Sequence, residues 1–390
     1  MRLFHEIHRT NEGPAQYAEP EFTYLNRSAR VAASRVRQLL EAWFSRYPVA
    51  GQGDLVGRFR STDDKQHRSA FFELFLHELL LCLDCRVEIH PSVGEMSRRY
   101  PDFLAEPPSA NRFYMEAVVA TGESTEDAAA RARMNDVYDT LNRLESPNFF
   151  IGVKLRGAPR TPPPARQIRS FLAQRFVAQD PDEMAKVLES GGLDALPHWY
   201  YEHENWELDF FPIPKRPDAR GRAGVRPLGM QFYQLVCIEP RVAIRDAIVK
   251  KAGRYGEPDL PYVVAANALD ENVDEIDVEE ALFGKEEFTV SRQQAGSSCV
   301  EMTRAPDGVW GSESGPRYTR VSAVLVAAPV LPWNVPRAPM CLYHNPWAEK
   351  PYSSELTRLP QAFLEAGRVK RVGGESLAVV LGLPSGWPEA

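Results

Sequence analysis

Apolar residues recur at two spacings along this chain, and the two spacings predict a protein that mixes helices and strands. In residues 32–46 the apolar positions are three or four apart, as on one face of a helix. Residues 66–84 predict a second helix that is apolar nearly all round and therefore buried. The segments 86–90, 101–106 and 112–120 predict three strands after that helix, and the last strand alternates with period two.

The rest of the chain continues this mixture. Further helices are expected over residues 124–145, from the proline-rich connector at 157–166 to about residue 188, and over 240–254 and 355–366. Further strands are expected over residues 148–155, 206–215, 261–269, 320–330 and 377–381, with a strand or short helix at 230–238. Strands cluster after helices rather than alternating strictly with them, so the expected class is α/β in the mixed, α+β sense.

Composition narrows the class of protein. Of the 390 residues, 44% are hydrophobic and 25% charged, which excludes wholesale disorder. Five cysteines are too few for a disulfide scaffold, and the first residues carry charges and histidines where a signal peptide needs an apolar stretch. No run reaches the roughly 18 apolar residues of a membrane span. We therefore expect a cytoplasmic protein without a membrane partner.

Common catalytic motifs are missing from the sequence. It contains no Walker loop, no GxGxxG after a predicted strand, no GxSxG and no HExxH. Their absence argues against nucleotide-driven motors, dehydrogenases, serine hydrolases and zincins.

One basic loop is a candidate for binding nucleic acid. The chain carries 46 basic and 53 acidic residues, so such a role requires a local patch. The loop 214–227 is interrupted by proline and glycine, and its cations are Lys215, Arg216, Arg220, Arg222 and Arg226. These side chains can follow a phosphate backbone by displacing counterions. The alternative is an arginine-rich surface loop without a ligand.

The buried helix at 66–84 carries a polar stripe. Gln66, Ser69, Glu73 and His77 follow one another at spacings of three, four and four. A carboxylate in such a place is costly to desolvate unless something pairs with it. Glu73 is therefore either half of a structural ion pair, or a ligand or orienting base in a site that the stripe lines.

Two more carboxylates follow on neighbouring strands. Asp102 opens the strand at 101–106, and Glu116 lies in the strand at 112–120. Strands joined by a short connection are neighbours, so the two side chains can converge, and two close carboxylates repel each other. A divalent cation is the usual remedy, and oxygen ligands favour Mg²⁺ or Mn²⁺.

These residues resemble the PD-(D/E)XK, or restriction-endonuclease-like, superfamily. The core of that family has a helix carrying a glutamate, followed by a β-meander carrying Pro-Asp and then Glu or Asp, any residue, and Lys. Glu73 matches the helix glutamate, Pro101 and Asp102 match the Pro-Asp pair, and Glu116 matches the next acid. The match covers about residues 66–120, less than a sixth of the chain.

The resemblance implies a restriction-endonuclease-like core, a mixed sheet flanked by helices. It implies metal-dependent hydrolysis of DNA phosphodiester bonds, in defence against foreign DNA or in repair. It also implies Mg²⁺ or Mn²⁺ held by Asp102, Glu116 and the carbonyl of Ala117, with Glu73 in or beside the ligand set.

The chain departs from the family at the lysine position, which holds Val118. Either another residue supplies the missing cation, with Lys154, Lys250 and Lys251 as the candidates, or the site binds without cutting. Lys251 is favoured because it shares a helix face with Arg254. Its helix and the following strand would then complete the core, with residues 121–230 largely inserted.

These inferences lead to an expected division of the chain. Residues 1–62 are expected to form an N-terminal helical segment, 63–210 the nuclease-like core, and 211–390 a C-terminal α+β region of which about 235–270 completes the core. DNA is the expected partner, and the oligomeric state, a homo-oligomer included, is left open. Two alternatives remain: an inactive core that binds nucleic acid or assembles with partners, and a structural protein whose three carboxylates never meet.

Overall fold

The computed structural model describes residues 1–92, 100–157, 159–222, 224–233, 239–270, 272–292 and 298–389. The chain forms two compact units. The first unit comprises Met1–Gly13, Pro20–Gly122 and Ile238–Ala390, and the second comprises Pro14–Glu19 and Glu123–Cys237. Both units mix helices with sheets, which confirms the mixed α/β class.

A mixed sheet is the centre of the first unit, and eight of the described strands form it in the order β1-β2-β3-β8-β11-β12-β13-β14. Their bounds are β1 Arg86–Ile89, β2 Phe103–Glu106, β3 Phe113–Ala120, β8 Tyr262–Ala268, β11 Val321–Ala327, β12 Met340–His344, β13 Gln361–Glu365 and β14 Arg368–Val372. Strands β1, β2 and β3 form an antiparallel meander. Strand β8 then pairs parallel to β3, with Tyr114 opposite Tyr262, and β11 pairs parallel to β8.

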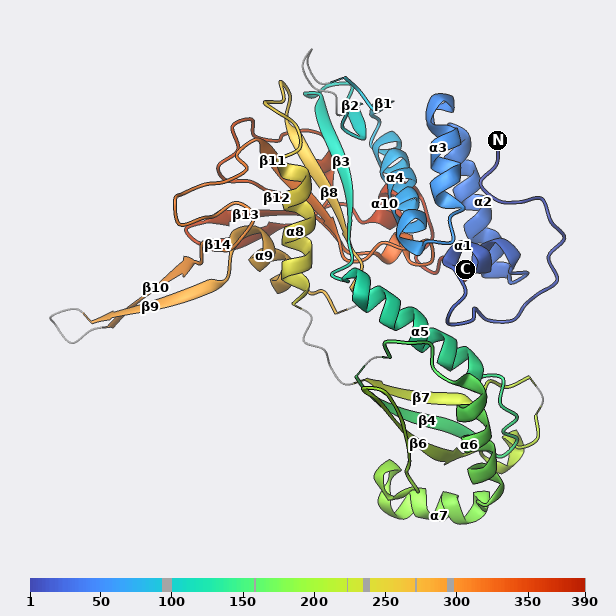
Figure 1. The fold of residues 1–390 in the computed structure, drawn as a ribbon. Coiled ribbons are helices and arrows are strands. Elements are labelled where there is room, and N and C mark those ends of the chain that lie inside the picture. The colour runs from blue at the N-terminus through green and yellow to red at the C-terminus, as the bar shows by residue number, and fades with distance from the viewer. Residues whose placement is uncertain are drawn as a thin grey trace. The chain divides into compact units, whose positions relative to one another are not determined.

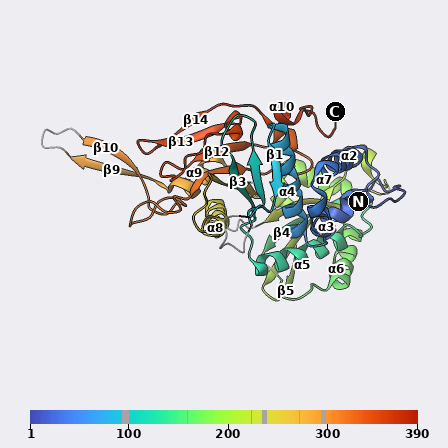
Figure 2. The same cartoon turned by 90° about the horizontal axis from the view of Figure 1, so that it is seen from above.

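The period-two alternation of these strands gives the sheet two apolar faces, and helices cover both (Figures 1 and 2). One face packs against α1 (Glu21–Arg27), α2 (Val31–Arg46), α3 (Val49–Phe59), α4 (Asp64–Cys82) and α10 (Leu377–Leu381). The other face packs against α8 (Pro240–Ala252) and α9 (Glu275–Phe283). Strands β8 and β11 lie between the two layers and are buried at every position.

Helix α4 is the buried helix that the sequence predicts. Asp63 caps its N-terminus by accepting a hydrogen bond from the amide of Lys65. Every residue from Ala70 to Leu80 is buried, because the helix has α2 and α3 on one side and the sheet on the other. The order of elements through this part of the first unit is α4-β1-β2-β3-α8-β8.

A two-stranded antiparallel hairpin, β9 (Glu286–Arg292) with β10 (Ser298–Arg304), extends away from the large sheet in both views (Figures 1 and 2). Short 3₁₀ turns occur in both units. They lie at Leu193–Ala195, Pro217–Ala219, Val335–Arg337 and Glu355–Arg358.

The second unit has a four-stranded sheet in the order β5-β6-β4-β7. The strands are β4 Phe149–Arg156, β5 Trp199–His203, β6 Trp206–Pro214 and β7 Leu228–Tyr233, and the helices are α5 Thr125–Leu141, α6 Ala165–Val177 and α7 Pro181–Gly191. A capping box of Ser124 and Asp127 starts α5. Side chains of α5, α6, β4 and β6 form a hydrophobic core separate from the two cores of the first unit.

The second unit interrupts the first. The chain leaves the first unit after Gly122, between β3 and α8, and returns at Ile238. Most of the second unit is thus an insertion, close to the 121–230 expected, and β8 completes the sheet of the first unit. Residues 123–210, which were expected within the core, lie in the second unit because they pack on a core of their own.

Several elements differ from the sequence-based prediction. Leu377–Leu381 is a short helix rather than a strand, because Ser376 caps it and a short apolar run has no decisive periodicity. The predicted helix at 355–366 is a 3₁₀ turn followed by β13. The predicted helix ending near 188 is two helices, since Asp180 caps a new start at Pro181. The prediction at 230–238 lies partly outside the described residues.

None of the described helices combines the length and apolar character that crossing a membrane requires.

Candidate active site

The antiparallel pairing of β2 and β3 brings Asp102 and Glu116 together. Phe103 lies opposite Met115, so Asp102, one residue before, is level with Glu116. Asp102 is half-buried and accepts a hydrogen bond of 2.6 Å from the amide of Ala117. Glu116 is 1% exposed and points to the face of the sheet that α8 covers. Neighbouring strand positions therefore place two carboxylates at one point of the sheet.

Three donors surround the Glu116 carboxylate. Lys251 Nζ, on α8, lies 2.5 Å from Oε1, and Arg254 Nη1, just after α8, lies 2.7 Å from the same oxygen. The Tyr255 hydroxyl lies 2.5 Å from Oε2 and also 2.8 Å from the carbonyl oxygen of Tyr100. A carboxylate this deeply buried is tolerated because opposite charges and a hydroxyl surround it.

Lys251 therefore contacts Glu116, and its role as a replacement for the family's lysine stays a prediction. Of the two other candidates, Lys154 lies in the second unit and pairs with Asp194 at 2.8 Å. Lys250 precedes Lys251 on α8 and is exposed. The i, i+3 relation of Lys251 and Arg254 along the chain brings both cations to one carboxylate.

The electrostatics of Asp102 show how crowded with negative charge the site is. Burial, and then the negative charge of the neighbouring Glu116, raise the pKa of Asp102 to about 7. Lys251 opposes the shift, and Glu73 adds to it. Asp102 is thus a carboxyl group that gains from any additional positive charge placed beside it.

Glu73 lies on the opposite side of the sheet from Glu116, because α4 packs against the other face. Its Oε1 accepts from the hydroxyl of Tyr47 at 2.6 Å, and its Oε2 pairs with Arg58 at 2.8 Å. Glu73 therefore forms a structural ion pair, which was the first of the two alternatives for this residue. Glu73 still lies close enough to Asp102 to affect its pKa.

The donor set fits a hard cation. The group offers oxygen ligands from two carboxylates, Asp102 and Glu116. Within the described ranges, no larger cluster of three or more His, Cys, Asp or Glu side chains could hold a metal. Mg²⁺ is commonly held by one or two carboxylates, with waters and substrate phosphates completing the shell. Ala117 contributes its amide to Asp102, and a ligand role for its carbonyl stays a prediction.

The cations of the basic loop serve mainly to hold the second unit together. Lys215 is buried, and its Nζ donates to the carbonyl of Ser146 at 2.8 Å. The other contacts are Arg220 to Asp182 and to the carbonyl of Lys215, Arg222 to the carbonyl of Asp218, and Arg226 to the carbonyls of Pro14 and Ala15. Arg216 is exposed. These contacts agree with the alternative of a surface loop, and nucleic-acid binding by the five residues stays a prediction.

Sequence reasoning missed three side chains of this region. Tyr255, Tyr47 and Arg58 reach the carboxylates from segments far from them in the chain. In the sequence, only the spacing of Lys251 and Arg254 indicated that the end of α8 contributes to the site. The pairing of β3 with β8, which brings that helix end to Glu116, has no local signature in the sequence.

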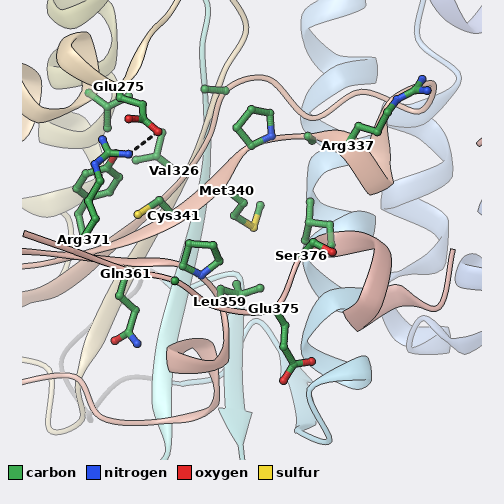
Figure 3. Close-up of a pocket in the computed structure, with 18 of the residues that line it drawn as sticks. Glu275, Val326, Arg337, Met340, Cys341, Leu359, Gln361, Arg371, Glu375 and Ser376 are labelled. Atoms are coloured by element: carbon green, nitrogen blue, oxygen red, sulfur yellow. Dashed lines mark ion pairs between the residues drawn. The ribbon is translucent and has the colours of Figure 1, made fainter. Parts of the chain in front are cut away.

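A separate cavity of about 690 Å³ lies in the first unit, between α9 and the strands β11 to β14 (Figure 3). Its walls are largely apolar, and Arg371 pairs with Glu275 at one side, as the dashed line in Figure 3 marks. The predicted catalytic and metal-binding residues do not line this cavity. The carboxylate group at β2 and β3 therefore remains the candidate active site.

Comparison with known proteins returns no match to this chain among family models, curated proteins or solved structures.

Proposed function

We propose that this protein is a metal-dependent nuclease that hydrolyses DNA phosphodiester bonds. One observation carries the proposal: Asp102 and Glu116 meet at adjacent strand positions, and Lys251 lies 2.5 Å from Glu116. The order α4-β1-β2-β3-α8-β8 is consistent with the resemblance to the PD-(D/E)XK superfamily. Lys251 would replace the lysine that the family carries where this chain has Val118.

Asp102 and Glu116 are the residues that would hold Mg²⁺ or Mn²⁺. Their oxygen donors suit such an ion, and burial followed by the charge of Glu116 raises the pKa of Asp102, so an added positive charge would favour its ionised form. When bound, an ion of this kind neutralises charge on the scissile phosphate and lowers the pKa of a coordinated water.

The neighbouring side chains have distinct roles in this proposal. Lys251 orients the attacking water and stabilises negative charge that develops on the phosphate. Arg254 adds a second positive charge at the same carboxylate oxygen. Tyr255 positions Glu116 from the other oxygen, since its hydroxyl also lies near the Tyr100 carbonyl. Glu73 acts outside this group, by its charge and by anchoring helices.

Cleavage of labelled single-stranded, duplex and branched DNA, with Mg²⁺ or Mn²⁺ against EDTA, tests the proposal. We expect metal-dependent cleavage that falls by about 100-fold or more in Asp102→Asn and Lys251→Met. Lys250→Met is the matched control, because it removes the neighbouring charge on the same helix, and it should retain activity within about threefold. Cleavage that persists in EDTA would contradict the proposal. So would cleavage that persists in both folded site variants.

A second function is favoured by one feature of the site. Lys251 and Arg254 already neutralise Glu116 without an added ion. A core with such internal pairing also suits an inactive nuclease-like module that binds nucleic acid or assembles with partners. DNA binding by folded wild-type protein, without cleavage under any metal condition, would establish that alternative.

A further inference from the structure

Tyr318 adopts a backbone conformation that an aromatic residue rarely accepts. Its φ is +50°, in the left-handed region, just before β11. For a bulky side chain this conformation is unfavourable by about 1–3 kcal/mol, and such strain persists only where the surroundings impose it.

The surroundings of Tyr318 do impose it. The carbonyl of Tyr318 accepts from the amide of Val321 at 2.9 Å, and the amide of Arg317 donates to Trp310 at 2.8 Å. On the other side, Arg320 Nη1 donates to the carbonyl of Gly256 at 2.5 Å. The turn is therefore fixed to both its own strand and the segment that follows α8.

These contacts place the Tyr318 ring beside the candidate active site. Tyr318 is partly buried and packs against the hydrophobic core that includes Tyr255 and Ala252. A Cβ added at Gly253 would lie 3.9 Å from the ring, so the ring flanks the end of α8. Gly253 directly precedes Arg254, whose guanidinium contacts Glu116.

Arg317 lies on the outer side of this ring. Its guanidinium carbon is 5.0 Å from the centre of the Tyr318 ring, and its Nη2 is 3.1 Å from the Tyr318 hydroxyl. Arg317 is exposed, whereas Tyr318 is half-buried beneath it. The result is a layered pair, an aromatic ring under a guanidinium group, with the outer layer open to solvent.

We propose that Arg317 and Tyr318 form a stacking platform for an unpaired nucleobase next to the phosphate that is cleaved. Guanidinium planes and aromatic rings are the two surfaces on which proteins stack unpaired bases, and here they lie one above the other. The inference rests on the proposed nuclease function and refines its substrate: DNA with a single-stranded or displaced nucleotide at the site. Within a duplex, the paired base cannot reach the platform.

Binding of labelled oligonucleotides to the full chain in EDTA, which prevents metal-dependent cleavage, tests the platform. Three probes of equal length are compared: single-stranded DNA, duplex DNA, and a single strand with central abasic sites. We expect wild type to bind the intact single strand most tightly. Arg317→Ala and Tyr318→Asn should each weaken that binding by about 5- to 100-fold, with little effect on the abasic strand.

Two further variants separate stacking from folding and from charge. Asparagine tolerates a positive φ, so Tyr318→Asn removes the ring without adding backbone strain, and Tyr318→Phe keeps the ring and should bind within about twofold of wild type. Arg368→Ala, at an exposed arginine of β14, controls for the loss of one positive charge and should change little.

The outcomes decide the inference independently of the nuclease proposal. If Arg317→Ala weakens binding of the intact and abasic strands equally, Arg317 contacts a phosphate rather than a base, and the platform is overturned. Unchanged binding in Tyr318→Asn, or no binding of single strands by folded wild type, would also overturn it. Metal-dependent cleavage by wild type, with unchanged binding in the platform variants, would support the nuclease and overturn the platform. Base-dependent binding without cleavage would support the platform and contradict the nuclease.

Discussion

At the scale of single residues, buried charge is the dominant feature of this protein. Glu116 is held by two cations and a phenol, and Glu73 by one cation and a phenol. The sequence indicated both carboxylates, because each interrupts an otherwise apolar pattern. It did not indicate Tyr255, Tyr47 or Arg58, since tyrosine and arginine at those positions break no pattern.

His77 is the residue from which we expect a clear dependence of stability on pH. It is buried beside the ring of Tyr47, 4.9 Å away, with the ring of Phe103 on β2 6.3 Å away and Arg46 nearby. Burial, and then the charge of Arg46, lowers the pKa of His77 to about 4. The unfolded chain therefore binds a proton below about pH 6.5 that the folded chain does not, so this contribution is complete above that pH and is lost as the pH falls towards 4.

The corresponding experiment compares wild type with His77→Phe by urea unfolding at about pH 7 and about pH 4.5. Wild type should lose about 2–3 kcal/mol more unfolding free energy than the variant over this interval, at about 1.4 kcal/mol for each unit of pKa shift. Equal losses in the two proteins would mean that His77 is not the group that titrates.

At the scale of elements, two buried glutamates of α4 are where the neighbouring helices attach. Arg58 at the end of α3 pairs with Glu73, and Arg46 at the end of α2 pairs with Glu78. Tyr47, between those helices, also donates to Glu73. Glu73 and Glu78 thus orient α2 and α3 on a helix whose segment from Ala70 to Leu80 is otherwise largely apolar.

This role predicts strong coupling between Arg58 and Glu73. Arg58→Met leaves a buried carboxylate with one hydroxyl partner, and we expect the unfolding free energy to fall by about 3 kcal/mol. The double variant Arg58→Met with Glu73→Gln should recover a large part of that loss. A double-mutant cycle measured by chemical denaturation checks this, and additive losses would contradict the ion-pair role.

The elements around the site were largely predictable. Helix α4 follows from a long run of apolar residues, and β3 is long enough for its alternation of apolar positions to show. The short strands β1 and β2 were predicted from their place between α4 and β3. Helix α10 was not predictable as a helix, since five apolar residues fit either structure. The convergence of Lys251 on Glu116 required the parallel pairing of β3 with β8, which is set by tertiary packing alone.

At the scale of the whole molecule, the two units have separate hydrophobic cores, so each should unfold as its own cooperative element. A matched pair of glycines makes this testable. Gly157, in the second unit, has φ +75°, and a Cβ there would lie 2.1 Å from the carbonyl oxygen of Asn205. Gly284, in the first unit, has φ +89°, and a Cβ there would lie 1.9 Å from the carbonyl oxygen of Ala305.

Gly157→Ala and Gly284→Ala should each destabilise only their own unit, by about 2–4 kcal/mol, because alanine strains the backbone and meets a carbonyl. Hydrogen exchange followed by mass spectrometry would locate the loss of protection. Loss spread across both units in either variant would show that they unfold together.

The insertion between β3 and α8 also has a consequence during synthesis on the ribosome. Strand β3 is complete at Ala120, but its parallel partner β8 begins at Tyr262, about 140 residues later. At typical translation rates of about 5–20 residues per second, the nascent chain spends about 7–30 s with one edge of β3 unpaired. Most of the second unit, contiguous in the chain, emerges during that interval and can fold first. The ion pairs of Glu116 with Lys251 and Arg254 therefore cannot form in place until the last third of the protein has begun to leave the ribosome.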